Sequence, residues 1–347
     1  MHLKKVIVAV AVLGVIVGSV IVYNIYSSIF SPNTAFNNES AFVFVPTGSS
    51  FNEVKNQLEP LLVDIESFES VANKKGYSTN IKAGKYAIKK GMNNNDIVNT
   101  LRSQNIPVKV SFNNQESVAN LAGRIASQIE ADSLSLLNAF NDQSFLEANS
   151  FNDDTKLSLY IPNSYEFFWN TSAEGFRDRM LEEYNKFWNN NRLEKANNIN
   201  LSKEEVIALA SIVQKETAKV DERPRVAGVY LNRLKKNILL QADPTVIYAI
   251  KKGTGKYDTI IKRVLKKDLE YNSPYNTYKY AGVPPGPIAM PDITSIDAVL
   301  NSETHEYYYF VADLKNFGYH KFAKTLRQHN LNAQEYHRWL NAQNINR

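Results

Sequence analysis

A single glutamate ends an apolar helical stripe in the middle of the chain. Residues 209–220 read "LASIVQKETAKV", and the acid in this run is Glu216. It continues a set of apolar positions spaced three and four residues apart, namely Val206, Leu209 and Val213. Positions at these spacings share one face of an α-helix, so the carboxyl group is expected on the buried face. Burial penalises the ionised form and raises the pKa of a carboxyl, which could then donate a proton near neutral pH.

Two simpler explanations of this acid stay open. It could be a solvated residue at a frayed helix end, or it could pair with Arg223, Arg225 or Arg233, which follow in the sequence. The helix itself is clearly marked, because Ser202 with Glu205 three residues later forms a capping-box pattern ahead of the apolar run. The pattern therefore predicts a helix with an acid near its end, in one of these environments.

Polar and aromatic side chains gather in the segments that follow. The run "DERPRVAGVYLNRLKK" predicts a helix with Asp221 as N-cap and Pro224 in its first turn, where proline is tolerated. The run "NILLQADPTVIYAI" contains a turn with Gln241 and Asp243. Further Asn, Tyr, Thr and Pro residues occur in "YNSPYNTYKYAGVPPGPIAMP" and "YYYFVAD". A polysaccharide groove needs such groups, although loops also carry them without any function.

The elements that position these groups fall into two folded parts. Within residues 42–112 the pattern predicts the order strand, helix, helix, strand, helix, strand, which describes a small α+β module. From 113 to about 200 the pattern is mostly helical and leads into the acid-bearing helix. It is interrupted by "LYIPNSYEFFWNTS", whose composition suits either a loop that lines a sugar groove or an aromatic patch of core.

The N-terminus carries a segment that could span a membrane. Residues 6–23 are uncharged, and at ~1.5 Å per residue they form a helix of roughly 27 Å, close to the ~30 Å hydrocarbon core. Two lysines precede it, which predicts a cytoplasmic N-terminus at 1–5, an uncleaved signal anchor at 6–26 and an extracytoplasmic remainder. A cleaved signal peptide is disfavoured, since no clear small-x-small site precedes the polar tether predicted at 27–41.

The composition excludes several kinds of site. Of the 347 residues, 44% are hydrophobic and 22% are charged, as in ordinary globular proteins. Cysteine is absent, which excludes disulfides, thiol catalysis and thiolate metal sites, and five histidines offer little for a dedicated metal site. The formal net charge of +5 suits a solvated lysine-rich surface or an anionic partner. No Lys/Arg block is dense enough to predict nucleic-acid binding.

The ordered motifs resemble those of one enzyme family, the MltG (YceG-like) endolytic murein transglycosylases. The resemblance is carried by "ASIVQKETAKVDERPRVAGVYLNRL", "LLQADPTVIYAI", "SPYNTY", "GVPPGPIAMP", "YYYFVAD" and "HKFAKTLRQHN". It covers nearly the whole chain, including "IPNSYEFFWNTS", and "KAGKYAIKKGM" resembles a LysM module. The implied fold is α+β: a single N-terminal transmembrane helix, a small LysM-like module at 42–112 and a larger mixed α+β catalytic domain at 113–347, with a helical lead-in at 113–200.

The resemblance also implies an activity. Members of the family cut nascent peptidoglycan strands internally, at the β-1,4 bond from N-acetylmuramic acid to N-acetylglucosamine. The cut is not hydrolytic and leaves a 1,6-anhydro-muramyl end. The implied partners are glycan strands and the penicillin-binding synthases that polymerise them, with the enzyme acting as a terminase of strand elongation. Neither a cofactor nor a metal is implied.

The family's catalytic glutamate falls on Glu216, which would protonate the glycosidic oxygen and then accept the proton of the muramyl 6-hydroxyl. Many members have a second glutamate where this chain has Gln214, so only one acid remains in the motif. His320, beside Phe322, is expected to be structural. The other matched positions carry over as substrate-binding or support residues: Asn232, Arg233, Gln241, Asp243, Thr245, Tyr275, Asn276, Thr277 and Tyr278.

Some of these positions have specific expected roles. Gln241 and Asn276 could hold the N-acetyl groups of the substrate, and Tyr275 or Tyr278 could stack on a sugar face. Asp243 could stabilise positive charge at the sugar C1, or it could only cap the turn that precedes Pro244. Both roles of Asp243 stay open.

Two other functions remain as alternatives. A non-catalytic peptidoglycan-binding scaffold of the cell-wall synthesis machinery explains the anchor and the module equally well, but it has no need of a buried acid. A pyridoxal-phosphate lyase would need a Schiff-base lysine and a phosphate cradle, and the sequence contains no Gly-rich phosphate loop. The buried acid therefore favours the lytic transglycosylase.

Overall fold

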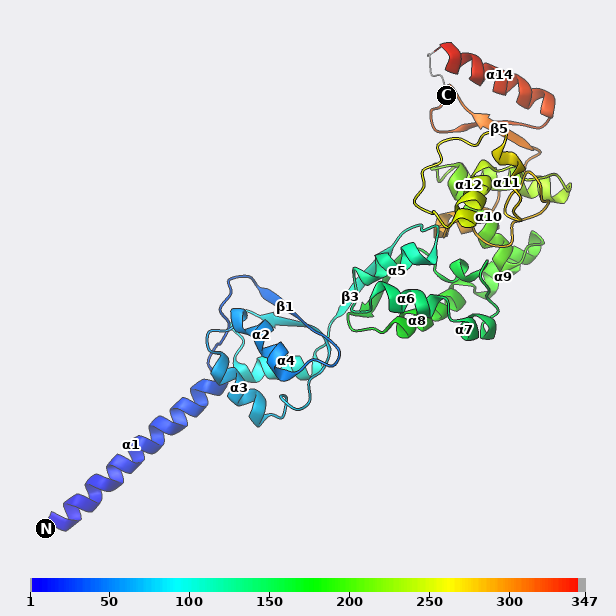
Figure 1. The fold of residues 1–347 in the computed structure, drawn as a ribbon. Coiled ribbons are helices and arrows are strands. Elements are labelled where there is room, and N and C mark those ends of the chain that lie inside the picture. The colour runs from blue at the N-terminus through cyan, green and yellow to red at the C-terminus, as the bar shows by residue number, and fades with distance from the viewer. Residues whose placement is uncertain (1, 343–347) are drawn as a thin grey trace. The chain divides into compact units, whose positions relative to one another are not determined.

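The computed structural model describes residues 2–342, which form two compact units (Figure 1). Unit 1 contains the residues up to Val110, together with Gln128–Ala131 and Glu166–Ser172. Unit 2 contains the other described residues. The fold is a mixture of α-helices and short β-strands, as the sequence predicts.

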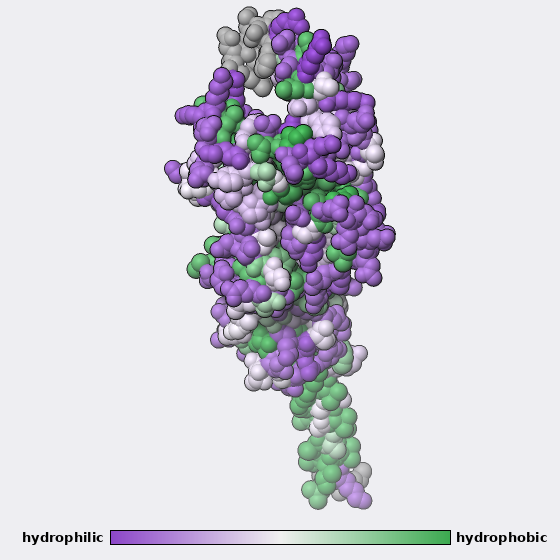
Figure 2. Space-filling model, turned by 90° about the vertical axis from the view of Figure 1, so that its right-hand side faces the viewer, coloured by the Kyte–Doolittle hydropathy of each residue, from purple (hydrophilic) through white to green (hydrophobic). Residues whose placement is uncertain are grey.

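The first helix, α1 (His2–Phe30), can cross a membrane. Its segment Leu3–Phe30 has 28 residues, so it is ~42 Å long and exceeds the ~30 Å hydrocarbon core. None of its most apolar window is buried in the protein, and the helix presents an almost continuous apolar surface (Figure 2). Its length and composition fit a single membrane-spanning segment, as predicted.

The segment predicted as a tether at 27–41 is part of the folded unit. Helix α1 continues to Phe30, and Asn33 just beyond it is only 4% exposed. The Asn33 side chain accepts a hydrogen bond from the Asp64 backbone N–H (2.8 Å) and donates to Asn94 Oδ1 (2.7 Å). A buried and fully bonded amide holds this stretch in place, so unit 1 follows the apolar helix without a flexible linker.

Unit 1 has the order of elements that the sequence predicts. These are β1 (Ser40–Val45), α2 (Phe51–Leu58), η1 (Glu59–Leu61), α3 (Ile65–Lys74), β2 (Gly84–Lys89), α4 (Asn94–Ser103) and β3 (Pro107–Phe112). Strands β1 and β2 pair antiparallel, with Ser40 opposite Lys89 and Val45 opposite Gly84. Helices α2 to α4 bury one apolar face against the pair, through fully buried side chains such as Val54, Phe68 and Leu101, which meet Ile88 of β2 in one core.

Unit 2 is mainly helical. Its elements begin with α5 (Val118–Ala126), α6 (Ser133–Phe140), α7 (Gln143–Ala148), η2 (Lys156–Leu159), β4 (Asn163–Phe168), α8 (Ala173–Phe187) and α9 (Asn190–Asn198). They continue with α10 (Lys203–Glu216), α11 (Arg223–Lys235), α12 (Asp243–Thr254), η3 (Asp268–Glu270), α13 (Ile293–Leu300), β5 (Tyr309–Ala312), β6 (His320–Ala323) and α14 (Leu326–Ala342). Helix α10 packs against α11, α12 and α13 and is the centre of this unit.

Two further short strand pairs complete the sheet structure, of which β5 with β6 is antiparallel. Strand β5 pairs with β6, with Tyr309 opposite Ala323, and α14 packs on both strands. Strand β3 pairs with β4, and residues of both strands belong to each unit. The insert predicted as a loop or a core patch is therefore a strand over 163–168, in which Phe167 is buried and Phe168 is 51% exposed.

Candidate active site

Helix α10 forms and is buried as its sequence predicts. Ser202 is the N-cap, its side chain accepts from the Glu205 backbone N–H, and the Glu205 carboxylate accepts from the Ser202 N–H in return. The apolar stripe of Val206, Leu209 and Val213 is fully buried. This stripe fixes the rotation of the helix, so it decides which way the residue at its end faces.

Glu216 is the last residue of α10, and its carboxyl is held by a phenol. The Tyr230 hydroxyl, on α11, donates to Glu216 Oε1 at 2.8 Å. Burial raises the pKa of Glu216 to about 7, and the charge of Asp243 adds to this rise. The hydrogen bond from Tyr230 and the charge of Arg233 act in the opposite direction. At neutral pH the group is therefore shared between its acid and carboxylate forms, which is the state a proton donor and acceptor needs.

This carboxyl lines a cavity of about 340 Å³. The lining combines charged, amide and aromatic side chains from five elements and two loops of unit 2: Glu216, Tyr230, Arg233, Leu240, Gln241, Asp243, Tyr278, Tyr309, Phe310, Leu326 and His329. Five of the residues predicted from the sequence meet here, namely Glu216, Arg233, Gln241, Asp243 and Tyr278. The volume is within the usual range of small-molecule sites, and it suits a short stretch of a polymer.

None of the three candidate arginines forms an ion pair with Glu216 in the part of the chain that the structure describes. Arg223 binds Asp292 (2.9 Å) and Arg225 binds Glu303 (2.9 Å). Arg233 donates instead to the backbone carbonyls of Tyr308 (2.7 Å) and Leu240 (2.9 Å). The acid is therefore neither a solvated helix end nor half of a salt bridge, and it keeps its raised pKa.

A tight turn brings Gln241 and Asp243 to the cavity. Gln241 has a φ of 51°, in the left-handed region, and its backbone N–H donates to Thr277 O at 3.1 Å. Asp243 begins α12 and accepts from the Tyr278 hydroxyl at 2.6 Å. The N-cap of α12 is Ala242, which forms no side-chain cap. Of the two roles open for Asp243, the position in the cavity is observed and a cap by its side chain is not.

Two buried threonines hold this turn in place. The hydroxyl groups of Thr245 and Thr277 are 2.8 Å apart, and Thr277 Oγ1 also accepts from the Ala242 N–H at 3.0 Å. Both residues are at most 1% exposed. They join the start of α12 to the segment that carries Tyr278, so they support the cavity from behind.

Asn276 and Tyr275 do not line the cavity, contrary to the expected contacts with sugar. Asn276 is fully buried, and its amide donates to the Leu269 and Tyr271 carbonyls (2.9 and 2.8 Å). Tyr275 is 1% exposed. Neither side chain is accessible to a substrate, because each is already enclosed by the protein.

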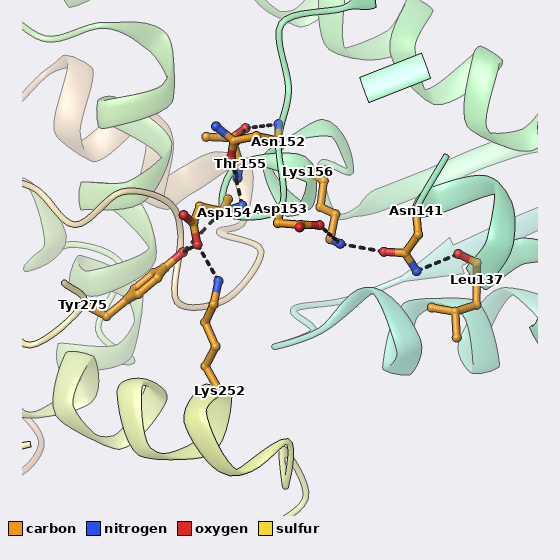
Figure 3. A network of polar contacts seen from close by, with 9 residues as sticks. All are labelled: Leu137, Asn141, Asn152, Asp153, Asp154, Thr155, Lys156, Lys252 and Tyr275. Atoms are coloured by element: carbon orange, nitrogen blue, oxygen red, sulfur yellow. Dashed lines mark hydrogen bonds and ion pairs between the residues drawn. The ribbon is translucent and has the colours of Figure 1, made fainter. Parts of the chain in front are cut away.

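Tyr275 belongs to a separate polar network (Figure 3). Its hydroxyl donates to Asp154 Oδ1 at 3.1 Å, and Lys252 on α12 donates to the same oxygen at 2.5 Å (Figure 3). Asp154 precedes η2, so the network joins the segment 152–156 to α12 and to the 275–278 segment. It fixes the wall of the site from outside.

Asn232 is also a support residue. Its amide donates to the backbone carbonyls of His305 (2.7 Å) and Tyr307 (3.1 Å) and so ties α11 to the segment that enters β5. Because β5 supplies Tyr309 and Phe310 to the cavity, this contact positions two lining residues.

The sequence reasoning missed several lining residues. Tyr230 lies three residues before Arg233 on the same helical face, a spacing that marks it as inward-facing but not as a partner of Glu216. Tyr309 and Phe310 come from the aromatic run "YYYFVAD". His329, on α14, stacks on Tyr309 with ring centroids 5.3 Å apart, and burial lowers its pKa.

The expected N-cap at Asp221 is wrong by one residue. Helix α11 begins at Arg223 after Glu222, whose side chain makes no cap. The Glu222 carboxylate instead accepts from the His320 backbone N–H (2.6 Å) and lies 2.8 Å from His320 Nδ1. Asp221 accepts from the Tyr319 hydroxyl at 3.0 Å. His320 thus joins β6 to the start of α11 and does not line the cavity.

Across the described residues, no group of three or more His, Asp or Glu side chains is arranged to hold a metal ion. The side chains of the cavity themselves offer one carboxyl with a pKa near neutrality, a second carboxyl group at Asp243, and neutral or cationic donors around them.

Comparisons with known proteins identify the family of the chain. A model of the YceG-like family matches residues 43–335. The chain is 30% identical over 341 residues to an endolytic murein transglycosylase of Bacillus subtilis, covering 92% of this chain and 91% of that protein. It is 27% identical to an endolytic murein transglycosylase of Streptococcus pneumoniae, covering 88% of this chain and 60% of that protein. The crystal structure of a YceG-like protein from Listeria monocytogenes matches with a TM-score of 0.57 and 28% identity, covering 85% of this chain and 99% of that chain.

Proposed function

The chain belongs to the YceG-like family, and we propose that it is an endolytic murein transglycosylase. It would cleave the β-1,4 bond from N-acetylmuramic acid to N-acetylglucosamine within glycan strands and leave 1,6-anhydro ends. The observation that carries this proposal is Glu216, a carboxyl with a pKa of about 7 in a cavity lined by aromatic and amide side chains. The names of the relatives support the same activity.

One carboxyl is sufficient for the reaction. Protonated Glu216 gives its proton to the glycosidic oxygen while the C1–O bond breaks. The resulting carboxylate accepts the proton of the muramyl 6-hydroxyl, whose oxygen attacks C1 and closes the anhydro ring. The acid is regenerated and no water is consumed. The attack is intramolecular and gains from proximity, and a pKa near ambient pH suits a group that acts first as acid and then as base.

The neighbours of Glu216 would divide the remaining tasks. Tyr230 engages Oε1 and so leaves Oε2 for proton transfer. Asp243, held by Tyr278, would stabilise the positive charge that develops at C1. Gln241 would bind an N-acetyl group and Tyr278 or Tyr309 would contact a sugar face, since all three line the cavity.

The support residues would act through the shape of the cavity. We assign Thr245, Thr277, Asn232, Tyr275 and Asn276 to this class, because each is bonded to backbone or to another side chain outside the cavity. Their substitution would weaken the site by loosening the turn at 241–243 or the strand β5.

The location of the enzyme follows from α1. With two lysines before the apolar segment, the N-terminus would stay in the cytoplasm and both units would lie on the extracytoplasmic side. There the enzyme would meet strands as the penicillin-binding synthases extend them, and an internal cut would end their growth. Unit 1 would serve as the LysM-like module that holds the site near the membrane.

The proposal is tested by digestion of purified, uncrosslinked glycan strands with the full-length protein in detergent, read by mass spectrometry. We expect products with 1,6-anhydro ends, one water lighter than reducing ends, and none with Glu216→Gln. Reducing ends would mean hydrolysis, which needs a second carboxyl and would point to Asp243. Intact strands that still co-sediment with the wild-type protein would refute the enzyme and support the scaffold.

A further inference from the structure

A second and larger cavity lies on the other side of the end of α10. It has a volume of about 810 Å³, more than twice that of the cavity at Glu216 (about 340 Å³), and Gln214 is one of its lining residues. Successive residues of an α-helix are ~100° apart, so Gln214 and Glu216 face roughly opposite sides of the last turn. The end of α10 therefore lies between the two cavities.

The lining of this cavity is rich in amide donors. Gln214 Oε1 accepts from the Asp292 backbone N–H (2.6 Å), and Asn163 Oδ1 accepts from the Ser164 backbone N–H (2.8 Å). A backbone N–H can bond only to the oxygen of an amide, so these contacts identify which atom is nitrogen. Within residues 2–342, neither NH₂ group forms a hydrogen bond, so both remain available as donors at the cavity.

Two further amide side chains belong to the lining. Asn113 Oδ1 accepts from Gln115 Nε2 at 2.8 Å, which leaves a third NH₂ group as donor. Asn114 has the opposite orientation, because its amide nitrogen donates to the Met290 carbonyl (2.7 Å) and its oxygen is left as an acceptor. The amides thus offer three neutral donors and one neutral acceptor. Ser111, Ser164, Arg124 and Asp292 also line the cavity, and the Asp292 carboxylate is paired with Arg223.

This pattern complements an N-acetylated sugar. Such a sugar presents acetamide, hydroxyl and ether oxygens as acceptors and an amide N–H as donor, and it carries no charge on these groups. Neutral amides recognise them without the desolvation cost of charged partners. The neighbouring cavity at Lys215 differs, because isoleucines, Lys251 and Glu116 line it.

We propose that the cavity lined by Asn113, Asn163 and Gln214 binds N-acetylated sugar units of the glycan strand away from the bond that Glu216 cuts. The inference rests on the proposed function, since an internal cut requires sugars on both sides of the bond. A strand that passes the end of α10 reaches both cavities, whereas a short fragment occupies only one. The cavity would thereby favour long strands as substrates.

The test measures the affinity of glycan strands, freed of their stem peptides, for the full-length Glu216→Gln protein in detergent. Asn163→Asp and Asn113→Asp each keep the oxygen that accepts the observed hydrogen bond and replace the NH₂ donor. We expect each to lower the affinity about 3- to 10-fold, the usual worth of one hydrogen bond. Asn138→Asp, the same change at an exposed position of α6, should have no effect.

With Glu216 intact, the same two variants should raise KM for long strands and leave kcat unchanged, because the lost contact is present in both ground and transition states. Unchanged affinity in both variants would overturn the inference. A loss seen only with strands that retain their stem peptides would overturn it too, since the cavity would then hold peptide.

The outcomes separate this inference from the proposed function. If wild-type protein releases anhydro ends but the variants bind strands normally, only the second cavity is refuted. If no anhydro ends form but the variants lose affinity, the cavity stands as a glycan site and the proposed chemistry fails.

Discussion

Two partly buried glutamates have pKa shifts in opposite directions. Glu216 is the last residue of α10, whereas Glu116 lies before α5 and binds Lys215 of α10. Glu216 accepts a hydrogen bond from the neutral Tyr230 hydroxyl, and burial raises its pKa to about 7. Burial acts in the same direction on Glu116, but Lys215 and Lys251, each at 2.7 Å, outweigh it and hold the pKa of Glu116 below its usual value. The chemical nature of the hydrogen-bond partner, and not burial alone, decides which acid can donate a proton.

The comparison of the two glutamates also explains the direction of the Lys215 side chain. Lys215 directly precedes Glu216, and an ammonium group beside that carboxyl would lower its pKa. In the structure, Lys215 turns to Glu116 and lines a different cavity. Its ammonium group pairs there with the Glu116 carboxylate, and the pKa of Glu216 stays raised.

The largest expected difference between the two glutamates is in activity. Glu216→Gln removes the proton donor and should lower kcat about 10²- to 10⁴-fold, the usual contribution of general acid–base catalysis. Glu116→Gln should retain most activity, because its carboxylate does not line the catalytic cavity. The release of anhydro ends measures both. If both variants are folded and lose activity equally, the two glutamates do not differ as proposed.

The next difference is the pH dependence of stability. The pKa of Glu216 rises from 4.5 to about 7 on folding, so the native state binds the proton more tightly. Stability should therefore decrease by about 3 kcal/mol as pH rises from about 4.5 to above 7, and Glu216→Gln should lack this decrease. The pKa of Glu116 is lowered on folding, so its contribution is present at neutral pH and is lost on acidification below about 4.5.

Urea unfolding of the full chain at several pH values, followed through the buried Trp188, measures these slopes. Wild-type protein and Glu216→Gln should diverge as pH rises, with the variant the more stable above neutrality. Curves that stay parallel would mean that Glu216 ionises in the fold as it does in the unfolded chain.

Periodicity predicted the end of α10 well, since a capping box and an apolar stripe fix where a helix starts and which face is buried. It could not identify Tyr230, whose partner lies 14 residues away on another helix. That contact depends on how α10 and α11 pack. The pattern placed the N-cap of α11 at Asp221, because it could not show that Tyr319 engages Asp221 and His320 engages Glu222.

The roles carried over from the family motifs were equally hard to predict, because they depend on packing. A motif match shows that Asn276 and Tyr275 occupy positions shared with relatives, but not whether a side chain faces substrate or core. Both are buried, whereas Tyr278 two or three residues later lines the cavity. The order of elements at 42–112 was predictable because each short helix and strand has its own local pattern and cap. The pairing of β3 with β4 was not, since it joins segments about 50 residues apart.

A smaller effect, on stability, is expected at Glu116, the glutamate that pairs with two lysines. Glu116→Gln leaves Lys215 and Lys251 facing each other without a carboxylate, and the Lys251 side chain is only 12% exposed. The free energy of unfolding at pH 7 should fall by about 1–2 kcal/mol, between the values of surface and buried pairs. Glu147→Gln, an exposed change on α7, is the control. A loss that does not shrink as the pH falls below about 4.5, where the contribution of the ionised Glu116 is lost, would show that the ion pairs are not its cause.

The smallest expected effects are shifts in the pH dependence of activity, and they should have opposite signs for two neighbours of Glu216, Tyr230 and Asp243. Tyr230→Phe removes the hydrogen bond that lowers its pKa, so the high-pH limb of kcat/KM, which reports the loss of the acid form, should move up by about half to one unit. Asp243→Asn removes a charge that raises the pKa, so the limb should move down by less. In Asp243→Asn the new side chain keeps an oxygen that can accept from the Tyr278 hydroxyl. The matched control for Tyr230→Phe is Tyr280→Phe, which removes a phenol outside the cavity. If both variants move the limb in one direction, or reduce kcat without moving it, their role is structural. Opposite shifts would show that the proton on Glu216 is set by its two named neighbours.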